Sequence, residues 1–153
     1  MDIVRFGALT LETVEQADVN VDTDTGARWR AAFPFDADRP GETLGEHADH
    51  TVVYNELDPG TRIGTHRDAV DELLFVLGGT VEAVVDGEAT TVEAESLAVV
   101  PAGRPHSVRN VGSDPARLVG VFATGELDST FETEPVVVDD EPAAGATERD
   151  AHD

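Results

Sequence analysis

The chain has 153 residues and a mass of 16.2 kDa, the size of one domain, and 40% of its residues are apolar, which is enough to bury a core. It carries 32 Asp and Glu against 10 basic residues, all of which are Arg, so its formal net charge is -22. We expect neither nucleic acids nor anionic membranes as partners, because this charge repels them. The lack of Cys excludes disulfides, thiolate catalysis and zinc sites with Cys ligands.

The acidic residues are spread over the whole chain, and no Lys balances them. High salt screens the repulsion within such a surface, so we interpret the chain as a cytosolic protein of a halophile. An acidic protein of a low-salt organism is the alternative. The first residues, MDIVRFGALT, lack a long apolar core, and no stretch reaches the roughly 18 apolar residues of a membrane span. We therefore expect a cytoplasmic location.

Residues 1–50 form the first expected segment, which packs on a barrel or on a partner chain. Apolar residues at positions 29, 31, 33 and 35 alternate with other residues, which predicts an additional strand here. We expect Trp29 to pack in the core rather than to contact a ligand.

Residues 51–124 form the second segment, where short β-branched runs alternate with turn residues. The Asp86-Gly87 pair is a two-residue hairpin signal. Closely spaced short strands indicate an all-β sandwich or barrel. The predicted strands are Thr51–Leu57, Glu72–Leu77, Thr80–Val85, Glu88–Val92, Leu97–Val100, His106–Val111 and Ala116–Ala123.

The predicted strand Glu72–Leu77 is apolar on both faces, which indicates that both faces are covered. One face fills the barrel, and the N-terminal segment or a second subunit covers the other, so we expect a homodimer. In the third segment, residues 125–153, we expect a strand at Val136–Val138 and then an acidic, partly disordered tail.

Candidate metal ligands lie at the turns of the β region. Residues two apart in a strand point the same way, so His66 and Asp68 can address one point in space. Glu72 opens the next strand, and His106 follows a separate turn. Two imidazoles and two carboxylates can therefore converge in the barrel mouth, where small-molecule sites are common. For His47, His50 and His152, which stand in no motif, we expect surface roles.

These residues stand in a pattern that resembles the cupin superfamily. The first cupin motif is Gly, five residues, His, one residue, His, three or four residues, Glu, six residues and Gly. The chain matches it with Gly60, His66, Asp68, Glu72 and Gly79. Its one departure is Asp68, which stands where the second His belongs.

The second cupin motif is Gly, five residues, Pro, one residue, Gly, two residues, His, three residues and Asn. Here the matching residues are Pro101, Gly103, His106 and Asn110, and Glu95 replaces the first Gly. We expect the motif Gly and Pro residues to serve turns whatever the function.

The resemblance implies an all-β, cupin-type double-stranded β-helix (jelly-roll) barrel with extra N-terminal strands. It also implies one divalent metal ion held by His66, Glu72 and His106. Carboxylate oxygen is an acceptable ligand for Fe, Mn, Ni or Zn, so Asp68 can complete the site. If Asp68 lies too far away, the other three residues still form a two-His, one-carboxylate face with open positions.

The residues do not identify one function, because cupins include dioxygenases, isomerases, lyases, decarboxylases and non-catalytic binding proteins. One hypothesis is a metal-dependent enzyme, dioxygenase-like or isomerase/lyase-like, that acts on a small organic substrate in the barrel. The alternative is a small-ligand or metal-binding module without turnover. A transcription factor is disfavoured, because the chain has no room for a helix-turn-helix domain and its charge is wrong. Tyr54, Asn55 and three Arg residues are candidates for the barrel rim: Arg62, Arg67 and Arg104.

Overall fold

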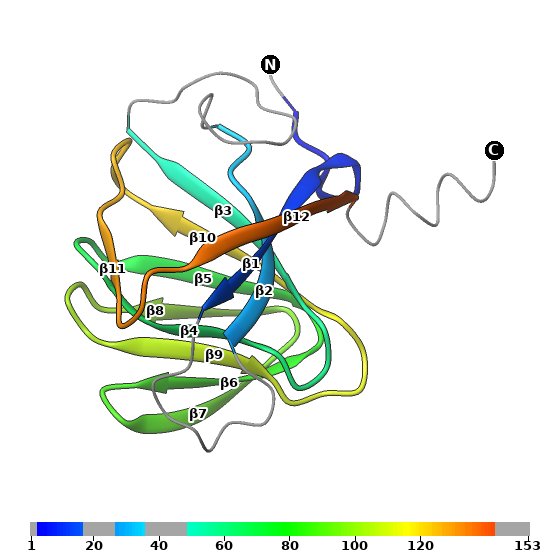
Figure 1. Cartoon of the computed structure of the whole chain (residues 1–153). Helices are drawn as coiled ribbons and strands as arrows, with labels where there is room; N and C mark the ends of the chain where they lie inside the picture. The colour runs from blue at the N-terminus through cyan, green and yellow to red at the C-terminus, as the bar shows by residue number, and fades with distance from the viewer. Residues whose placement is uncertain (1–2, 17–26, 36–48, 143–153) are drawn as a thin grey trace, which may run out of the picture.

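The computed structural model describes residues 3–16, 27–35 and 49–142, and these form an all-β protein with a single short 3-10 turn, η1 (Phe6–Ala8). Figure 1 shows the strands wrapped into a nearly closed barrel. None of the described segments contains a helix long and apolar enough to cross a membrane. The strands are β1 (Thr10–Gln16), β2 (Ala27–Ala32), β3 (Thr51–Leu57), β4 (Arg62–Asp68), β5 (Glu72–Gly78), β6 (Thr80–Val85), β7 (Glu88–Glu93), β8 (Ser96–Val100), β9 (His106–Asn110), β10 (Ala116–Phe122), β11 (Ser129–Phe131) and β12 (Val136–Pro142).

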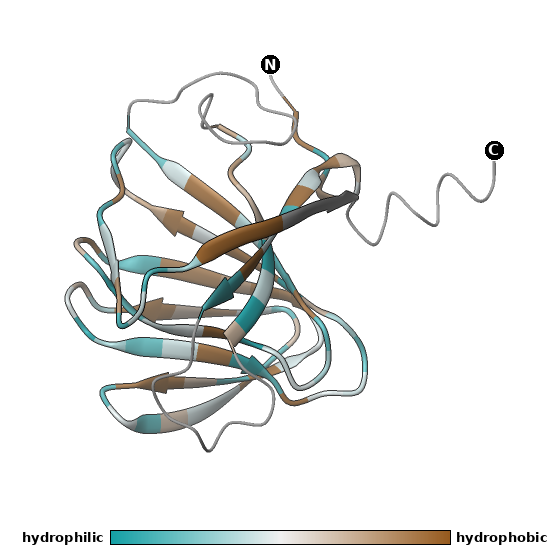
Figure 2. Cartoon of the chain, in the orientation of Figure 1, coloured by the Kyte–Doolittle hydropathy of each residue, from teal (hydrophilic) through white to brown (hydrophobic). Residues whose placement is uncertain are grey.

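The strands form one sheet in the order β7-β6-β9-β4-β2-β3-β10-β5-β8, with β1 paired to β2 and β12, and β11 paired to β4. Most neighbours are antiparallel, but β2 and β4 meet in parallel at Ala27 and Arg62. Apolar side chains from β6, β9 and β4 pack against those of β3, β5 and β10 in one core cluster. Figure 2 shows the apolar stretches along these strands. The sheet therefore curls over its own core, which confirms the expected jelly-roll barrel with extra N-terminal strands.

Every strand predicted between residues 51 and 124 is present within a residue or two of its expected ends. Three observed strands have no residue range among the predicted ones: β1, β4 and β11. In β4 the sequence RIGTHRD lacks apolar alternation, because His66 and Asp68 take inward positions that apolar residues usually occupy. The short β11 is recognisable only through its pairing with β4. The C-terminal strand extends beyond the expected Val136–Val138, and the predicted disordered tail from residue 143 lies outside the described residues.

Turn residues behave as their sequence signals predict. Asp86 and Gly87 both have positive φ, at 51° and 81°, as a two-residue hairpin between β6 and β7 requires. The motif residue Gly79 has φ 84°, and a Cβ there would lie 2.8 Å from the Ala116 Cα. Buried Asn110 donates side-chain hydrogen bonds to the backbone oxygens of Leu57 and Asp114, at 2.9 and 2.8 Å. This motif Asn therefore joins two loops of the barrel.

Glu95 occupies the position of the missing motif glycine, and its φ of 66° is in the left-handed region that favours glycine. We expect Glu95→Gly to raise the free energy of unfolding by about 1 kcal/mol, because it removes a Cβ that this conformation crowds. Chemical denaturation measures the change. The control is Glu93→Gly, which removes the same charge from the extended strand β7 and should destabilise the protein. A loss of stability in Glu95→Gly would contradict the argument.

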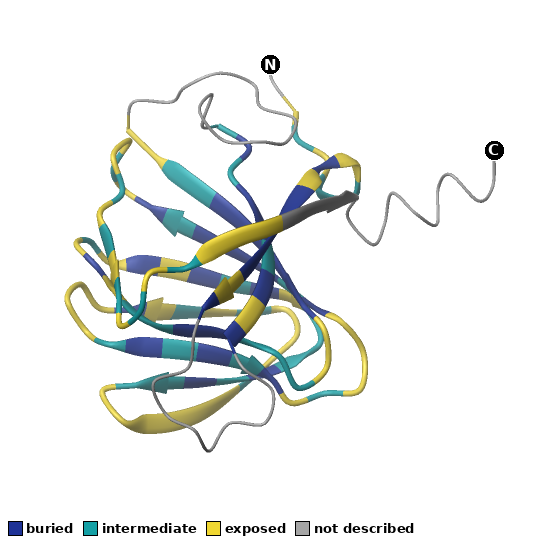
Figure 3. Ribbon diagram, viewed as in Figure 1, coloured by how far each residue is buried: buried dark blue, intermediate teal, exposed yellow. Residues whose placement is uncertain are grey.

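The two faces of β5 have different environments. Leu74 and Val76 are 2% and 1% exposed and fill the barrel. On the outer face, the N-terminal segment covers β3 and β10, where Phe6 stacks on Tyr54 with ring centroids 4.9 Å apart. Farther along this face, Leu73 remains 39% exposed. Figure 3 shows that exposed positions recur along β8 and cover most of β7.

Candidate metal centre

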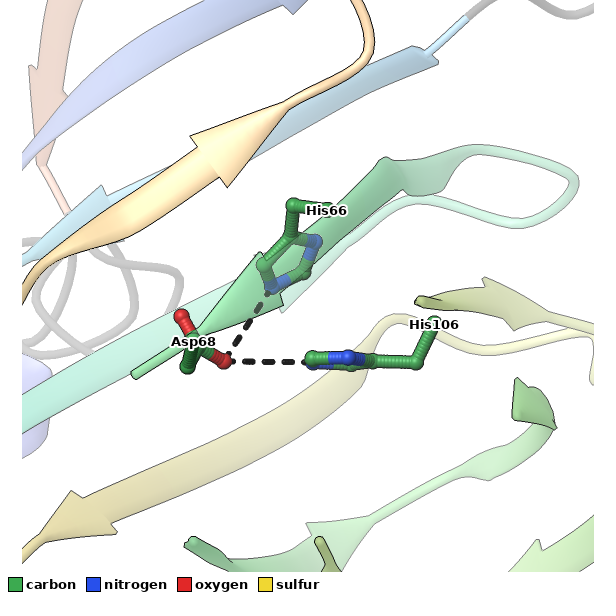
Figure 4. A group of neighbouring side chains, drawn as sticks. All are labelled: His66, Asp68 and His106. Atoms are coloured by element: carbon green, nitrogen blue, oxygen red, sulfur yellow. Dashed lines mark ion pairs between the residues drawn. The ribbon is translucent and has the colours of Figure 1, made fainter. Parts of the chain in front are cut away.

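Two neighbouring strands bring the predicted ligands together inside the barrel. His66 and Asp68 lie two residues apart on β4, and β9 pairs with β4 so that His106 is opposite His66. The three side chains converge, as Figure 4 shows, and one ligand atom from each lies within 4.8 Å of the others. The loop before β9 is fixed beside them, because the Gly103 amide donates a 2.8 Å hydrogen bond to the Asp68 carbonyl oxygen. Backbone pairing thus determines the geometry of the group.

The Asp68 carboxylate lies between the two imidazoles. Its Oδ2 atom is 3.3 Å from His106 Nε2 and 3.7 Å from His66 Nε2. Both Asp68 Oδ2 and His106 Nε2 are buried and have no hydrogen-bond partner. Unpaired buried polar atoms are costly, so their convergence suits a ligand that binds both. A divalent cation meets this requirement, because imidazole nitrogen and carboxylate oxygen are its common ligands.

The imidazoles are oriented by their other nitrogens. His66 Nδ1 lies 2.7 Å from the Gly64 carbonyl oxygen, and His106 Nδ1 lies 2.9 Å from that of Arg104. A carbonyl oxygen only accepts hydrogen bonds, so each Nδ1 carries a proton and donates a hydrogen bond to it. Each Nε2 then faces the centre of the group, which is the arrangement of metal-binding histidines.

The short strand β11 supports both ligands of β4. Ser129 donates a 2.6 Å hydrogen bond to Asp68 Oδ1, which leaves Oδ2 toward the histidines. Phe131 stacks on His66, with centroids 4.7 Å apart and planes 18° apart. Trp29 stacks on the other side of Phe131 at 5.8 Å and is buried, so it packs in the core as expected, and it also lines the cavity described below. These contacts hold Asp68 and His66 in place.

The titration behaviour of the group follows from burial and mutual contact. Burial and the nearby His106 lower the pKa of His66 to about 4, so His66 is neutral at pH 7. Burial also opposes protonation of His106, but Asp68 and Glu72 outweigh it and raise its pKa to about 10. For Asp68, the contacts with His106 and Ser129 outweigh burial and lower the carboxyl pKa. A cation at this group must therefore replace the proton of His106.

Glu72 lies beside the group on β5. Its Oε1 atom is 3.6 Å from His106 Nε2, but it is outside the set of three whose ligand atoms all lie within 4.8 Å. Burial raises the pKa of Glu72. A Cβ at Gly120 on β10 would clash with Glu72 Oε2, so the carboxylate in this position uses the space that glycine leaves. The sequence left open whether Asp68 lies close enough to be a ligand. In the structure Asp68 lies beside both imidazoles, and Glu72 lies beside that of His106.

A cavity of about 990 Å³ contains these residues and opens to the surface. Asn55 lines it, as do the aromatic rings of Trp29, Phe122 and Phe131. His50 is exposed at its margin, whereas His47 and His152 lie outside the described residues.

Several rim candidates point elsewhere. Tyr54 lies on the outer face, where its hydroxyl donates a 2.6 Å hydrogen bond to Glu56 Oε2. The three Arg candidates at positions 62, 67 and 104 do not line the cavity. Sequence reasoning missed Ser129 and Phe131, because the acidic C-terminal segment shows no motif around them. Only their pairing with Asp68 and His66 reveals their role.

Comparison with known proteins agrees with this fold. Residues 53–122, which include most of the barrel strands, match the family described as Cupin domain. The polyketide synthase CurC of Streptomyces cyaneus is 36% identical over 62 residues, which is 40% of this chain and 40% of that relative. This chain therefore spans well under two thirds of the relative's length.

Solved structures show the same architecture. An uncharacterized conserved protein with a double-stranded beta-helix domain from Klebsiella pneumoniae aligns with a TM-score of 0.54 and 27% identity, over 60% of this chain and 80% of that chain. The oxalate decarboxylase of Bacillus subtilis, studied for its Mn(II) centers, aligns with a TM-score of 0.55 and 18% identity, over 77% of this chain and 30% of that chain. At this identity the second likeness concerns the fold alone.

Proposed function

We propose that this protein binds one divalent metal ion at His66, Asp68 and His106, and that it is an enzyme acting on a small organic molecule in the barrel. The observation that carries the proposal is that two buried atoms without a hydrogen-bond partner, Asp68 Oδ2 and His106 Nε2, face each other at 3.3 Å beside His66. The Mn(II) centers of the oxalate decarboxylase with a similar fold support the choice of a metal. Glu72 is proposed as a further ligand from β5.

The donor set suits Mn, Fe, Ni or Zn, because nitrogen and carboxylate oxygen are acceptable ligands for all four. Two carboxylates and two neutral imidazoles give the site a charge of about -2, which stabilises a dication and reduces its strength as a Lewis acid. The bound ion would orient a substrate and polarise its oxygen atoms. The protein's own residues would enclose the substrate, with Phe131 and Trp29 as an apolar wall next to His66.

A binding module without turnover is the alternative to an enzyme. Elemental analysis of protein purified at molar salt, followed by oxygen uptake and product analysis with catechols, flavonoids, thiols and sugar acids, distinguishes them. The proposal predicts a stoichiometric divalent metal and metal-dependent conversion of one substrate class. Metal with no conversion across the panel would favour the binding module, and absence of any bound divalent metal would overturn the metal site.

Ser129 is expected to control metal affinity without being a ligand. Ser129→Ala removes the 2.6 Å hydrogen bond to Asp68 Oδ1 and lets the carboxylate rotate. We expect the metal dissociation constant to rise by about 10 to 100-fold, the usual cost of losing such support. Calorimetric titration measures it, with Thr130→Ala, an exposed neighbour on the same strand, as the control. Equal affinities of Ser129→Ala and the wild type would show that Asp68 needs no such support.

We also propose a homodimer that forms through the outer face of β5 and β8. Register pairs Leu73 with Val99 and Phe75 with Leu97, so their side chains form one apolar strip. Leu97 and Val99 are 55% and 59% exposed, although this chain is rich in acids elsewhere. A second copy offers the same apolar strip, and a two-fold axis would pair the two strips.

Light scattering at high salt tests the dimer, with an expected mass of about twice 16.2 kDa. Leu97→Glu should shift the protein to a monomer, because it places a charge in the strip. Thr91→Glu on the exposed strand β7 is the matched control and should leave the mass unchanged. A wild-type monomer at all concentrations would refute the proposal.

A further inference from the structure

The cavity around the candidate metal group is lined by acids and by none of the described Arg residues. Among the described residues, six carboxylates contribute to its wall. Asp68 and Glu72 would offset the charge of a bound dication. Glu126, Asp128 and Glu134 are exposed, so they stand where a ligand enters. The lining acids are Glu12, Asp68, Glu72, Glu126, Asp128 and Glu134.

None of the described Arg side chains lines this cavity, and five of them contact groups elsewhere. Arg104 contacts Asp86 at 2.6 Å, and Arg28 contacts Glu15 at 3.1 Å. Arg30 lies 2.9 Å from Asp58. Two more donate hydrogen bonds to Gly60 and Tyr54, namely Arg109 and Arg117. A carboxylate ligand would thus enter a negative cavity without the bidentate Arg partner that such ligands usually find.

The apolar part of the wall is largely aromatic. Trp29, Phe131 and His66 form a continuous stack, with Phe131 in the middle. Aromatic rings attract cations at their faces and pack with uncharged rings at faces and edges, and Trp29 and His66 are the outer rings of this stack. The aromatic wall and the acidic mouth therefore both favour a cationic or uncharged ligand over an anion.

We propose that the cavity selects an uncharged or cationic aromatic molecule and discriminates against organic acids. This inference rests on the proposed use of the cavity as a ligand site, and it narrows the substrate class of that site. The carboxylates at the mouth repel anions, and the aromatic wall holds the ring.

Trp29 offers a direct readout, because it is the one Trp of the chain and lies in the cavity wall. Three probes share one ring and differ in charge: benzyl alcohol, benzylamine and benzoate. Their binding is followed by Trp fluorescence in full-length protein loaded with zinc and in protein treated with a chelator. Cyclohexylmethanol, which has similar size and no aromatic face, controls for the ring. Each titration is made at low and at molar KCl.

We expect the alcohol and the amine to bind at least about tenfold more tightly than benzoate at low salt, since several carboxylates act on the charge within about 10 Å. Molar KCl should shrink the gap between benzylamine and benzoate, and cyclohexylmethanol should bind more weakly than benzyl alcohol. The triple variant E126Q/D128N/E134Q changes only exposed mouth residues and should reduce the benzoate penalty by several fold.

The inference is overturned if benzoate binds the metal-free protein as tightly as benzylamine, if the triple variant leaves the gap unchanged, or if neither the alcohol nor the amine alters Trp29 fluorescence at millimolar concentration. The metal-free arm separates this inference from the metal site. Charge selection that persists in a protein shown to bind no metal would support the ligand class and refute the metal proposal. Zinc binding without charge selection among the three probes would support the metal proposal and refute the proposed ligand class.

Discussion

Replacing His106 by alanine is expected to weaken metal binding by more than about 100-fold, beyond the cost of losing a supporting residue. His106 is the one member of the group of three that comes from β9, and its buried Nε2 lies 3.3 Å from Asp68 Oδ2. Its loss removes a ligand and leaves the two residues of β4 to hold the ion. Calorimetric titration with zinc or manganese measures the affinity, and any metal-dependent activity should fall with it.

The control for this variant is His50→Ala, which removes an exposed imidazole at the cavity margin and should bind metal like the wild type. His106 is 2% exposed, so alanine leaves a void, and circular dichroism must show that the barrel persists. His106→Gln, which fills more of the space, serves as a second variant. Unchanged affinity in both folded variants would exclude His106 as a ligand.

Variants of Asp68 distinguish a ligand from a supporting residue. If Asp68 is a direct ligand, Asp68→Ala should cost about as much affinity as His106→Ala. If Asp68 only supports the histidines, its replacement should weaken metal binding by about 10 to 100-fold. Asp68→His restores the usual cupin set and should retain or tighten nickel and zinc, which favour imidazole.

Salt is expected to have the second large effect, a rise of the thermal midpoint by at least about 10 °C between dilute buffer and molar KCl, equivalent to several kcal/mol for a chain of this size. The net charge is -22, and the excess carboxylates repel one another in the folded state. The Debye length falls from about 10 Å at 0.1 M to about 3 Å at 1 M, so molar salt removes most of this repulsion. Scanning calorimetry over a series of KCl concentrations makes the measurement.

The charge mechanism itself is tested by E88Q/E93Q/E95Q, which neutralises three exposed acids of the β7 region. This variant should be more stable than the wild type at low salt and should show a smaller salt effect. A midpoint that is flat or falls with KCl would contradict the interpretation of the chain as a halophilic protein.

The cupin motifs were sufficient to predict the barrel, because their turns and apolar strands are local signals. The pair Asp86 and Gly87 is enough to identify a hairpin. The two-residue spacing of Leu74 and Val76 identifies the core face of β5. The strand β4 escaped the same reasoning, since its inward positions carry ligands in place of apolar side chains.

The candidate site was predictable in its members but not in its geometry. Spacing places His66, Asp68 and His106 at the barrel mouth, yet only strand register shows that Asp68 lies between the imidazoles and that Glu72 lies to one side. The support from β11 depends on contacts between segments about 60 residues apart, such as Ser129 with Asp68. No local pattern encodes such a contact.

Metal binding by the wild type, compared with that of the His66→Ala, His106→Ala double variant, tests the central claim most directly. Both proteins are purified at molar salt, stripped with a chelator, titrated calorimetrically with manganese and zinc, and analysed for bound metal after dialysis. We predict one ion per chain in the wild type, with release of a proton from His106 near neutral pH, and none in the double variant. A wild type that binds no divalent metal more tightly than the folded double variant would contradict the account.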